Sequence, residues 1–144
     1  MAVQRELPYA NFNVVVEAGL GEDVGFSEAE LPSGELEVIE YREGSDRVSS
    51  TRKLPGRVAY PNVTLKRGVA GGLELYRWWD AVRDGAPERR DVTITLLDEQ
   101  RQPVQRWRLR NAWPAKLAYG TLDARGNEVL IESLELAHEG FAVD

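Results

Sequence analysis

The segment from Val92 to Trp113 constrains the fold more than any other part of the chain. Val92–Leu97 is apolar and β-branched, Asp98–Gln102 is a polar turn, and Val104–Trp113 alternates in character. Successive side chains of a strand point to opposite faces of its sheet. One face of the second arm carries Trp107, Leu109, Asn111 and Trp113, and the other carries a row of arginines, Arg106, Arg108 and Arg110. The segment therefore predicts an antiparallel pair of strands with one packed face and one charged face.

Four other segments have the composition of strands. β-branched and alternating residues assign strands to Phe12–Glu17, Leu36–Tyr41, Val63–Lys66 and Glu128–Ala137. In the last of these, a slip in the alternation predicts a bulge. Its apolar residues divide between two faces, with Val129 and Ile131 opposite Leu130, Leu134 and Leu136. We therefore expect both faces of this strand to be largely covered.

One segment, about residues 72–84, is predicted to be helical. Its apolar residues follow the i, i+3, i+4, i+7 spacing of a buried helix face, and they are Leu75, Trp78, Trp79 and Val82. Gly85 marks its end. Because the tryptophan pair matches this buried stripe, we interpret it as core rather than as a platform for a ligand. One amphipathic helix beside about seven strands predicts a mainly β fold, an antiparallel β-barrel or sandwich with one flanking α-helix over an open edge or face.

Composition limits the classes of protein that fit the chain. At 144 residues we expect a single domain, residues 1–144. Cysteine is absent, which excludes disulfides and thiolate chemistry and fits folding in a reducing compartment. We expect neither a secretory signal nor a membrane-spanning segment, because no leader pattern occurs and no apolar run approaches the roughly 20 residues of a membrane helix. The formal net charge of -6 disfavours a general nucleic-acid binder.

A search for catalytic motifs favours a protein that is not an enzyme. His138 is the only histidine, so a multi-histidine metal site is excluded and we assign it a structural or surface role. No Gly-x-Ser-x-Gly elbow occurs, and the glycines at Gly19–Gly21 and Gly71–Gly72 lack the Lys-Ser/Thr of a phosphate loop. We therefore predict no catalytic residues, no cofactor and no metal site.

The stretch Glu40–Gly56 predicts an extended β-hairpin with little to bury. Its tip, Glu43–Asp46, has the Gly, Ser and Asp that suit a reversal. In its return arm, Val48 and Leu54 are the only large apolar residues. Such a hairpin needs a partner outside its own domain, which indicates another copy of the chain and a role in assembly.

Charge is segregated on either side of the hairpin tip. From Glu17 to Glu43 the charged residues are acidic except for Arg42, whereas from Arg47 to Arg57 they are all basic. These blocks can be solvated faces of an isolated domain. In a self-assembling protein they would instead bring unlike surfaces of successive copies together. The residues alone leave both interpretations open.

Six short strings occur in order along the chain. They are Pro8-Tyr9 with Phe12, Glu40–Gly44, Lys53–Gly56, Leu65–Gly68, Arg106-Trp107 with Asn111–Pro114, and Ala137–Gly140. In combination they resemble the tail tube proteins of contractile phages and of phage-derived contractile injection systems, from about Pro8 to Phe141. The departures from that pattern are the doubled Trp78-Trp79 and the glycine-rich Ala70–Gly72.

The resemblance implies a structural subunit that forms hexameric rings, which stack into a hollow inner tube. Strands of six subunits would join into one sheet lining the lumen, and an extended hairpin would reach the adjacent ring. The implied partners are other copies of the chain, a contractile sheath, baseplate or spike proteins, a tube-terminating cap, and a cargo of protein or DNA in the lumen. We expect assembly in the cytoplasm and a final place in a phage tail or a cytoplasmic or released injection particle.

The resemblance also implies where the contacts lie. By its position Glu40–Gly56 matches the hairpin that joins rings, and the predicted contact residues are Arg42, Glu43, Gly44, Asp46, Arg47, Arg52, Lys53, Leu54, Pro55 and Gly56. The arginine row Arg106, Arg108 and Arg110 is predicted to line the lumen or to lie at a subunit interface.

The alternative to a tube subunit is a small monomeric β-barrel that binds a ligand in an apolar cavity, or an enzyme whose groups assemble only in space.

Overall fold

The computed structural model describes residues 14–20, 25–42, 44, 52–86 and 88–144. Within them the fold is mainly β, with antiparallel strands and one short helix, so the predicted fold class is confirmed. The elements in chain order are β1 (Val14–Glu17), β2 (Glu28–Ala29), β3 (Glu35–Tyr41), β4 (Arg52–Ala59), β5 (Val63–Gly68), α1 (Glu74–Arg83), β6 (Arg90–Leu97), β7 (Pro103–Tyr119), β8 (Ile131–Ala137) and β9 (Phe141–Val143).

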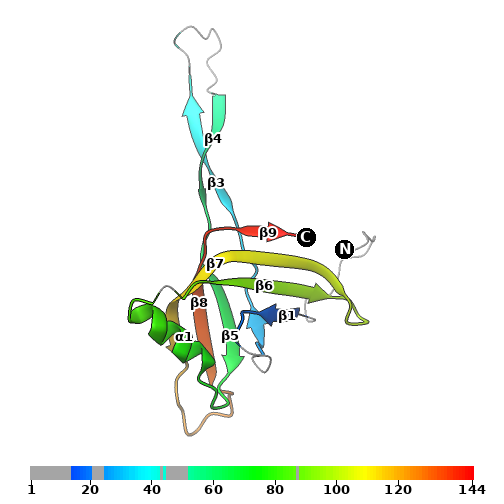
Figure 1. The fold of residues 1–144 in the computed structure, drawn as a ribbon, viewed down its shortest axis with the longest axis vertical. Helices are drawn as coiled ribbons and strands as arrows, with labels where there is room; N and C mark the ends of the chain where they lie inside the picture. Colours follow the sequence, from blue (N-terminus) through cyan, green and yellow to red (C-terminus); the bar gives the residue numbers. More distant parts are fainter. Residues whose placement is uncertain (1–13, 21–24, 43, 45–51, 87) are drawn as a thin grey trace.

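The body of the molecule is organised around β7, a strand of 17 residues. The first part of β7 pairs with β6 and β9, and its second part pairs with β8 (Figure 1). β1 extends the sheet beyond β6, while β5 and then β2 extend it beyond β8. β3 and β4 pair only with each other among the described strands, and they project from the body as a long hairpin (Figure 1).

A bulge at Asn111 lies where β7 changes partners. Asn111 has a φ of 49°, which is uncommon for a residue with a side chain. Its backbone N–H donates to Asp91 Oδ1 at 3.1 Å, and its Nδ2 donates to Glu139 Oε2 at 2.7 Å. The bulge shifts the alternation, so that Ala112 is buried and Asn111 is exposed. The prediction that Asn111 shares the packed face of Leu109 is therefore wrong.

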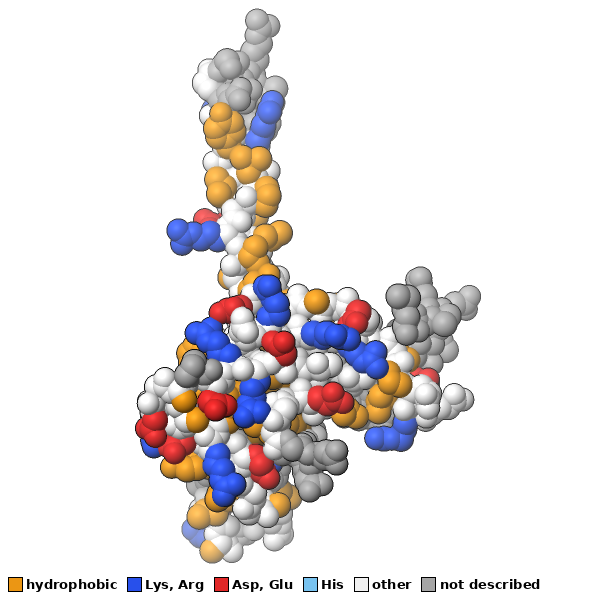
Figure 2. Space-filling view, viewed as in Figure 1, with side chains coloured by type: hydrophobic (Ala, Val, Ile, Leu, Met, Phe, Trp, Pro, Cys, Tyr) orange, Lys and Arg blue, Asp and Glu red, His pale blue; other side chains and the backbone are white. Residues whose placement is uncertain are grey.

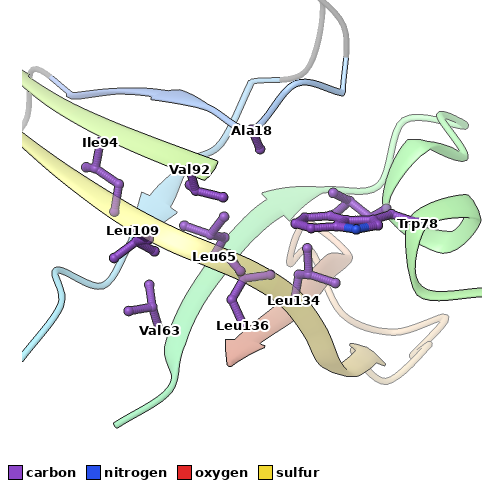
Figure 3. Packing of buried hydrophobic residues seen from close by; sticks show 11 residues of the cluster. Ala18, Val63, Leu65, Trp78, Val92, Ile94, Leu109, Leu134 and Leu136 are labelled. Atoms are coloured by element: carbon purple, nitrogen blue, oxygen red, sulfur yellow. The ribbon is translucent and has the colours of Figure 1, made fainter. Parts of the chain in front are cut away.

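The core lies against the inner face of the sheet and is covered at one end by α1 (Figure 3). Leu65, Leu134 and Leu136 from β5 and β8 are fully buried, as are Ile94 and Leu109 from β6 and β7. Burying one such side chain stabilises the fold by about 1.5–3 kcal/mol. This apolar cluster therefore gives the body a core of its own.

The helix α1 is shorter than the predicted 72–84 and buries only one of its two tryptophans. Trp78 is 2% exposed and its Nε1 donates to the Glu88 carbonyl at 2.6 Å. Trp79 is half-buried, with its ring 6.5 Å from that of Tyr76 and 5.0 Å from the guanidinium of Arg83. Consecutive helical residues point about 100° apart. The interpretation of the pair as core is thus correct for Trp78 and wrong for Trp79.

The strand β8 begins later than the sequence predicts. Its buried face carries Glu132, Leu134 and Leu136, while the intervening residues are half-buried. Val129 precedes the strand and is 72% exposed, so the expectation of covered faces is wrong at this residue. The apolar run extends beyond the strand into a surface connection, and the alternation alone does not reveal that boundary.

Candidate assembly surfaces

The β3–β4 hairpin is longer than the predicted Glu40–Gly56 and is exposed along its whole described length. Every residue of β3 is exposed, and so is every residue of β4 except Gly56, which is half-buried. Leu36 and Val38 are each 60% exposed, and Val58 is 51% exposed. Figure 2 shows hydrophobic side chains along the hairpin. The prediction of little apolar surface was based on residues 40–56. The exposed apolar side chains of Leu36, Val38 and Val58 lie outside that range, on the parts of β3 and β4 nearer the body.

The pairing register distributes these side chains over both faces of the hairpin. Leu36 lies opposite Val58 and Val38 opposite Pro55, whereas Ile39 lies opposite Leu54 on the other face. The shift between the first two pairs is a bulge in β4 at residues 56–57.

Gly56 is suited to this bulge because it has no side chain. A Cβ at this position would lie 2.9 Å from Cδ1 of Ile39 and 3.2 Å from Cβ of Glu37. The bulged strand therefore approaches β3 closely at Gly56. This fixes the register on both sides of the bulge and hence which apolar residues share a face.

The predicted contact residues in the hairpin fall into two groups. Glu43, Asp46 and Arg47 lie outside the described residues. The structure describes the others at the end of β3, in the turn or on β4, and they are Arg42, Gly44, Arg52, Lys53, Leu54, Pro55 and Gly56. Lys53 lies directly across from Glu40. The acidic and basic blocks thus meet within one hairpin, at least at this pair.

The predicted arginine row lies on β7, beside the C-terminal strand β9. Arg108 Nη2 lies 3.1 Å from Asp144 Oδ2, and Arg110 Nη2 donates to the Glu139 carbonyl at 3.0 Å. Arg106 exchanges backbone hydrogen bonds with Asp144 at 2.8 and 2.9 Å. Arg108 and Arg110 are exposed, whereas Arg106 is half-buried. The three residues therefore share a strand, but two of their side chains bind the segment that follows β8.

A buried charged cluster, which the sequence analysis missed, links β5, β8 and α1. Arg67 and Glu132 are direct cross-strand partners, and Arg67 Nε donates to Glu132 Oε1. Arg67 Nη2 also donates to Glu74 Oε2 at 2.9 Å and to the Gly72 carbonyl at 3.3 Å. Arg67 is 9% exposed and Glu132 is 3% exposed. The signal was present in the alternation, because Glu132 has the same parity as Leu134 and Leu136.

The electrostatics of the cluster favour the ionised forms of Arg67 and Glu74. Burial lowers the pKa of Arg67, but hydrogen bonds and charge attraction from Glu132 and Glu74 outweigh it, so the net pKa is raised. The pKa of Glu74 is lowered, first by a hydrogen bond from its own backbone N–H and then by Arg67. A charged pair of this kind is costly to break by removing one member. The cluster therefore fixes the start of α1 against β5 and β8.

His138, the single histidine of the sequence, makes contacts of a structural kind. His138 Nε2 lies 3.2 Å from the Pro61 carbonyl, and the Gly140 N–H donates to His138 Nδ1 at 3.2 Å. Its ring centroid is 5.7 Å from that of Tyr60. Across the described part of the chain, no group of three or more His, Cys, Asp or Glu residues is placed to hold a metal ion. No helix in that part is long and apolar enough to cross a membrane.

The sequence matches a known protein family over almost its whole length. The family is described as T4-like virus tail tube protein gp19, and the match covers residues 9–142. Among curated protein sequences none matches the chain.

Several solved structures are similar to the chain over nearly their full length. A chain in the anti-feeding prophage tube-terminating cap is 27% identical with a TM-score of 0.85, covering 100% of this chain and 95% of that one. A chain in the sheath-tube complex of PVC, an extracellular contractile injection system, is 27% identical with a TM-score of 0.84, covering 96% and 93%. A chain in the PVC sheath/tube terminator is 26% identical with a TM-score of 0.86, covering 96% and 98%.

Proposed function

The chain belongs to the T4-like virus tail tube protein family, and we propose that it forms hexameric rings that stack into the hollow inner tube of a contractile injection system or phage tail. The family gives it a structural role as a tube subunit. In the proposed assembly a contractile sheath surrounds the tube and drives it through a target envelope. A cargo of protein or DNA would travel in the lumen.

The observation that carries the proposal is the β3–β4 hairpin. Its two strands are paired in register, yet its apolar side chains are exposed and the described body does not cover them. Exposed apolar surface of this kind marks a contact with another molecule. In a stack of identical rings, the hairpin of each subunit reaches the adjacent ring and buries these side chains there.

Ring closure would involve the strands at the ends of the sheet. β1 and β2 end the path of strands in the body, and Val14 and Val15 on β1 are each 37% exposed. An unpaired edge offers backbone N–H and C=O groups to a neighbouring strand. Pairing between subunits would remove these edges and join six sheets into the wall of the lumen.

The arginine row has two locations compatible with such a ring. It either lines the lumen or lies between subunits, and its contacts with Asp144 and Glu139 leave Arg108 and Arg110 exposed in the single chain. Reagents that modify arginine inside intact tubes distinguish the two locations. Reaction at Arg108 and Arg110 is expected for the lumen, and protection of all three residues contradicts it.

The proposed partners follow from the assemblies in which similar chains occur. Those structures are described as a baseplate, a tube-terminating cap and a sheath-tube complex. We extend the same partner classes to this chain, with assembly in the cytoplasm and a final place in a phage tail or injection particle.

Negative-stain electron microscopy of the purified protein over a range of concentrations tests the proposal. Rings of six subunits, or filaments built from such rings, are the expected particles. Separate monomers at every concentration contradict it. That result would favour the alternative, a monomeric β-barrel that binds a ligand.

A further inference from the structure

The β3–β4 hairpin meets the body at the corner between β8 and β9, which consists of residues 138–140. Figure 1 shows this corner beside the base of the hairpin. Gly34 precedes β3 and Tyr60 follows β4, so both ends of the hairpin lie here. A Cβ at Gly34 would lie 3.4 Å from Cε1 of Phe141 and 3.5 Å from Cε1 of Tyr60. The two ends of the hairpin and the start of β9 are therefore in close contact.

The imidazole of His138 connects this corner to the end of the hairpin. Its ring centroid lies 5.7 Å from that of Tyr60, whose own ring lies 6.0 Å from that of Phe141 in an edge-to-face arrangement. Nε2 of His138 lies 3.2 Å from the Pro61 carbonyl, and the Gly140 N–H donates to Nδ1 at 3.2 Å. His138 is half-buried and Gly140 is buried. One ring thus holds the corner on one side and the segment after β4 on the other.

These two hydrogen bonds require the neutral form of His138. A backbone N–H only donates, so Nδ1 must present its lone pair to Gly140. The single proton of the neutral ring therefore lies on Nε2, where it is donated to the Pro61 carbonyl. A second proton on Nδ1 would place two donors face to face.

Protonation of Nδ1 breaks this arrangement. The new N–H can turn toward the Gly140 carbonyl, 3.2 Å away, which already accepts from the Arg110 N–H at 2.9 Å. The buried N–H of Gly140 would then lose its partner, which costs free energy. Because the imidazole is rigid, a rotation that relieves Nδ1 also moves Nε2 relative to Pro61. The corner and the base of the hairpin are therefore loosened together.

The charged groups around His138 favour the neutral ring. The titratable side chains on the elements packed around it are Glu135 on β8, Glu139 in the corner, Arg110 on β7, Arg89 before β6 and Tyr60 after β4. Glu139 Oε1 is bound by Arg89 Nη1 at 2.6 Å, and Glu135 Oε1 accepts from Asn62 Nδ2 at 2.9 Å. Nη2 of Arg110 lies 2.9 Å from where a Cβ of Gly140 would be. Both carboxylates thus already have partners, and a cation lies beside the glycine that faces Nδ1.

We propose that His138 is a proton-sensitive anchor of the β3–β4 hairpin. The neutral ring holds the base of the hairpin against the β8–β9 corner, and the protonated ring releases it. Because the closed arrangement requires the neutral ring, it is favoured at high pH and is lost as the pH falls through the range, about pH 8 to 5, in which histidines gain charge. The inference concerns a single subunit, so it holds whether or not subunits form rings.

Spin labels measure the release. Since the chain contains no cysteine, Val38→Cys on the hairpin and Gln100→Cys in the exposed β6–β7 turn place one nitroxide on each part. Double electron–electron resonance gives the distribution of distances between them, with labelled chains diluted in wild type so that distances within one chain dominate. We expect a narrow distribution at about pH 7.5 and a broader one at about pH 5. His138→Gln in the same background should give equal widths at both, because its amide does not titrate.

Matched controls separate this release from a general effect of acid. The pair Gln100→Cys and Lys116→Cys places both labels on the body and should keep its width. Because His138 is the only histidine, the ¹⁵N signals of its ring report its protonation in the same samples. If His138→Gln does not fold, His138→Phe, which keeps a flat ring beside Tyr60, takes its place.

Three results overturn the inference. The first is an unchanged hairpin width when the ring is protonated, and the second is a ring that is still neutral at about pH 5. The third is equal broadening in the His138 variant or in the body pair, which assigns the effect to other groups. Each of these results leaves the proposed function standing, because none depends on the formation of filaments.

Discussion

The β5–β8 pair and the β3–β4 hairpin are both antiparallel strand pairs with apolar residues, but they differ in what covers those residues. In β5 and β8 the side chains of Leu65, Leu134 and Leu136 are fully buried. In the hairpin, Leu36 and Val38 are each 60% exposed. Both pairs are in antiparallel register over most of their length, with a bulge at residues 56–57 of the hairpin, so pairing does not explain the difference. The first pair stabilises its own domain, whereas the apolar side chains of the second are left for another molecule.

Breaking the buried ion pair should give the largest loss of stability. Arg67→Met leaves the carboxylate of Glu132 buried without its partner, and we expect a loss of about 3–5 kcal/mol in the free energy of unfolding. Urea denaturation measures the effect. The double variant Arg67→Met with Glu132→Leu should recover much of the loss, because it removes both charges. A loss below about 1 kcal/mol in the single variant would show that Glu132 is solvated in the folded protein.

A truncation in the core should have a slightly smaller effect. Leu134→Ala removes a fully buried side chain between β5 and β7, and we expect a loss of about 2–5 kcal/mol. The matched control is Leu36→Ala on the hairpin, which should change the free energy of unfolding of the monomer by less than about 0.5 kcal/mol. Equal losses in the two variants contradict the distinction between the two strand pairs.

A charge on the hairpin should prevent assembly without unfolding the subunit. In Val38→Asp the new carboxylate would be buried at the contact between copies, where it has no partner. We expect the midpoint of thermal unfolding of the monomer to remain close to that of wild type and filaments to disappear from micrographs. Gln100→Asp adds the same charge to an exposed turn and should assemble normally. Normal filaments from Val38→Asp would mean that this face of the hairpin stays exposed in the tube.

The basic arm of the hairpin should affect tube length through charge. Arg52→Glu with Lys53→Glu reverses two charges, and we expect shorter tubes because carboxylates of the neighbouring copy would then be repelled. Electron microscopy measures the length distribution. The exchange Glu40→Lys with Lys53→Glu keeps opposite charges at the cross-strand pair. It therefore separates loss of this pair within the hairpin from repulsion by the neighbouring copy. Unchanged length in the double reversal contradicts the contact, and full recovery in the exchange assigns the effect to the hairpin itself.

Acid should weaken the contact between Glu74 on α1 and Arg67 on β5. We expect this to be the smallest of the predicted effects. The pKa of Glu74 lies below its ordinary value of 4.5, first because its own backbone N–H donates to the carboxylate and then because Arg67 binds it. A lowered pKa in the folded state adds stability above the ordinary value, and that stability is lost as the pH falls through the folded-state pKa. Urea denaturation of wild type and Glu74→Gln between pH 7 and pH 3 should therefore give curves that converge at low pH. A constant difference between them contradicts this contribution.

The local sequence pattern predicts the strands of the body well, but it does not predict the contacts between them. The alternation in Val92–Leu97 and Val63–Lys66 predicts strands that the structure confirms as β6 and β5. The bulge at Asn111 depends on hydrogen bonds to Asp91 and Glu139, which are distant in sequence, so the alternation could not place it. The boundary of β8 was missed for the same reason, because it depends on partners rather than on apolar content.

The assembly surfaces were predictable only in part. The sequence indicates a hairpin with an external partner, but it does not distinguish the exposed residues of β3 from those of a core strand, because both alternate. Burial depends on what lies beside the strand. The exposed apolar residues Val69, Leu73 and Leu122 lie in the β5–α1 and β7–β8 connections, and the alternation of the strands does not predict their exposure. Glu132 was predictable in principle, because its position in the alternation places a carboxylate on a buried face.

Amide hydrogen exchange before and after assembly tests most directly the claim that the hairpin is completed by another copy. The amides of β3 and β4 in the single subunit should exchange rapidly, whereas those of β5 and β8 are protected by the core. The account predicts that assembly slows exchange strongly in β3 and β4, with little change in the core of β5 and β8. Filaments in which β3 and β4 exchange as fast as in the free subunit would contradict it.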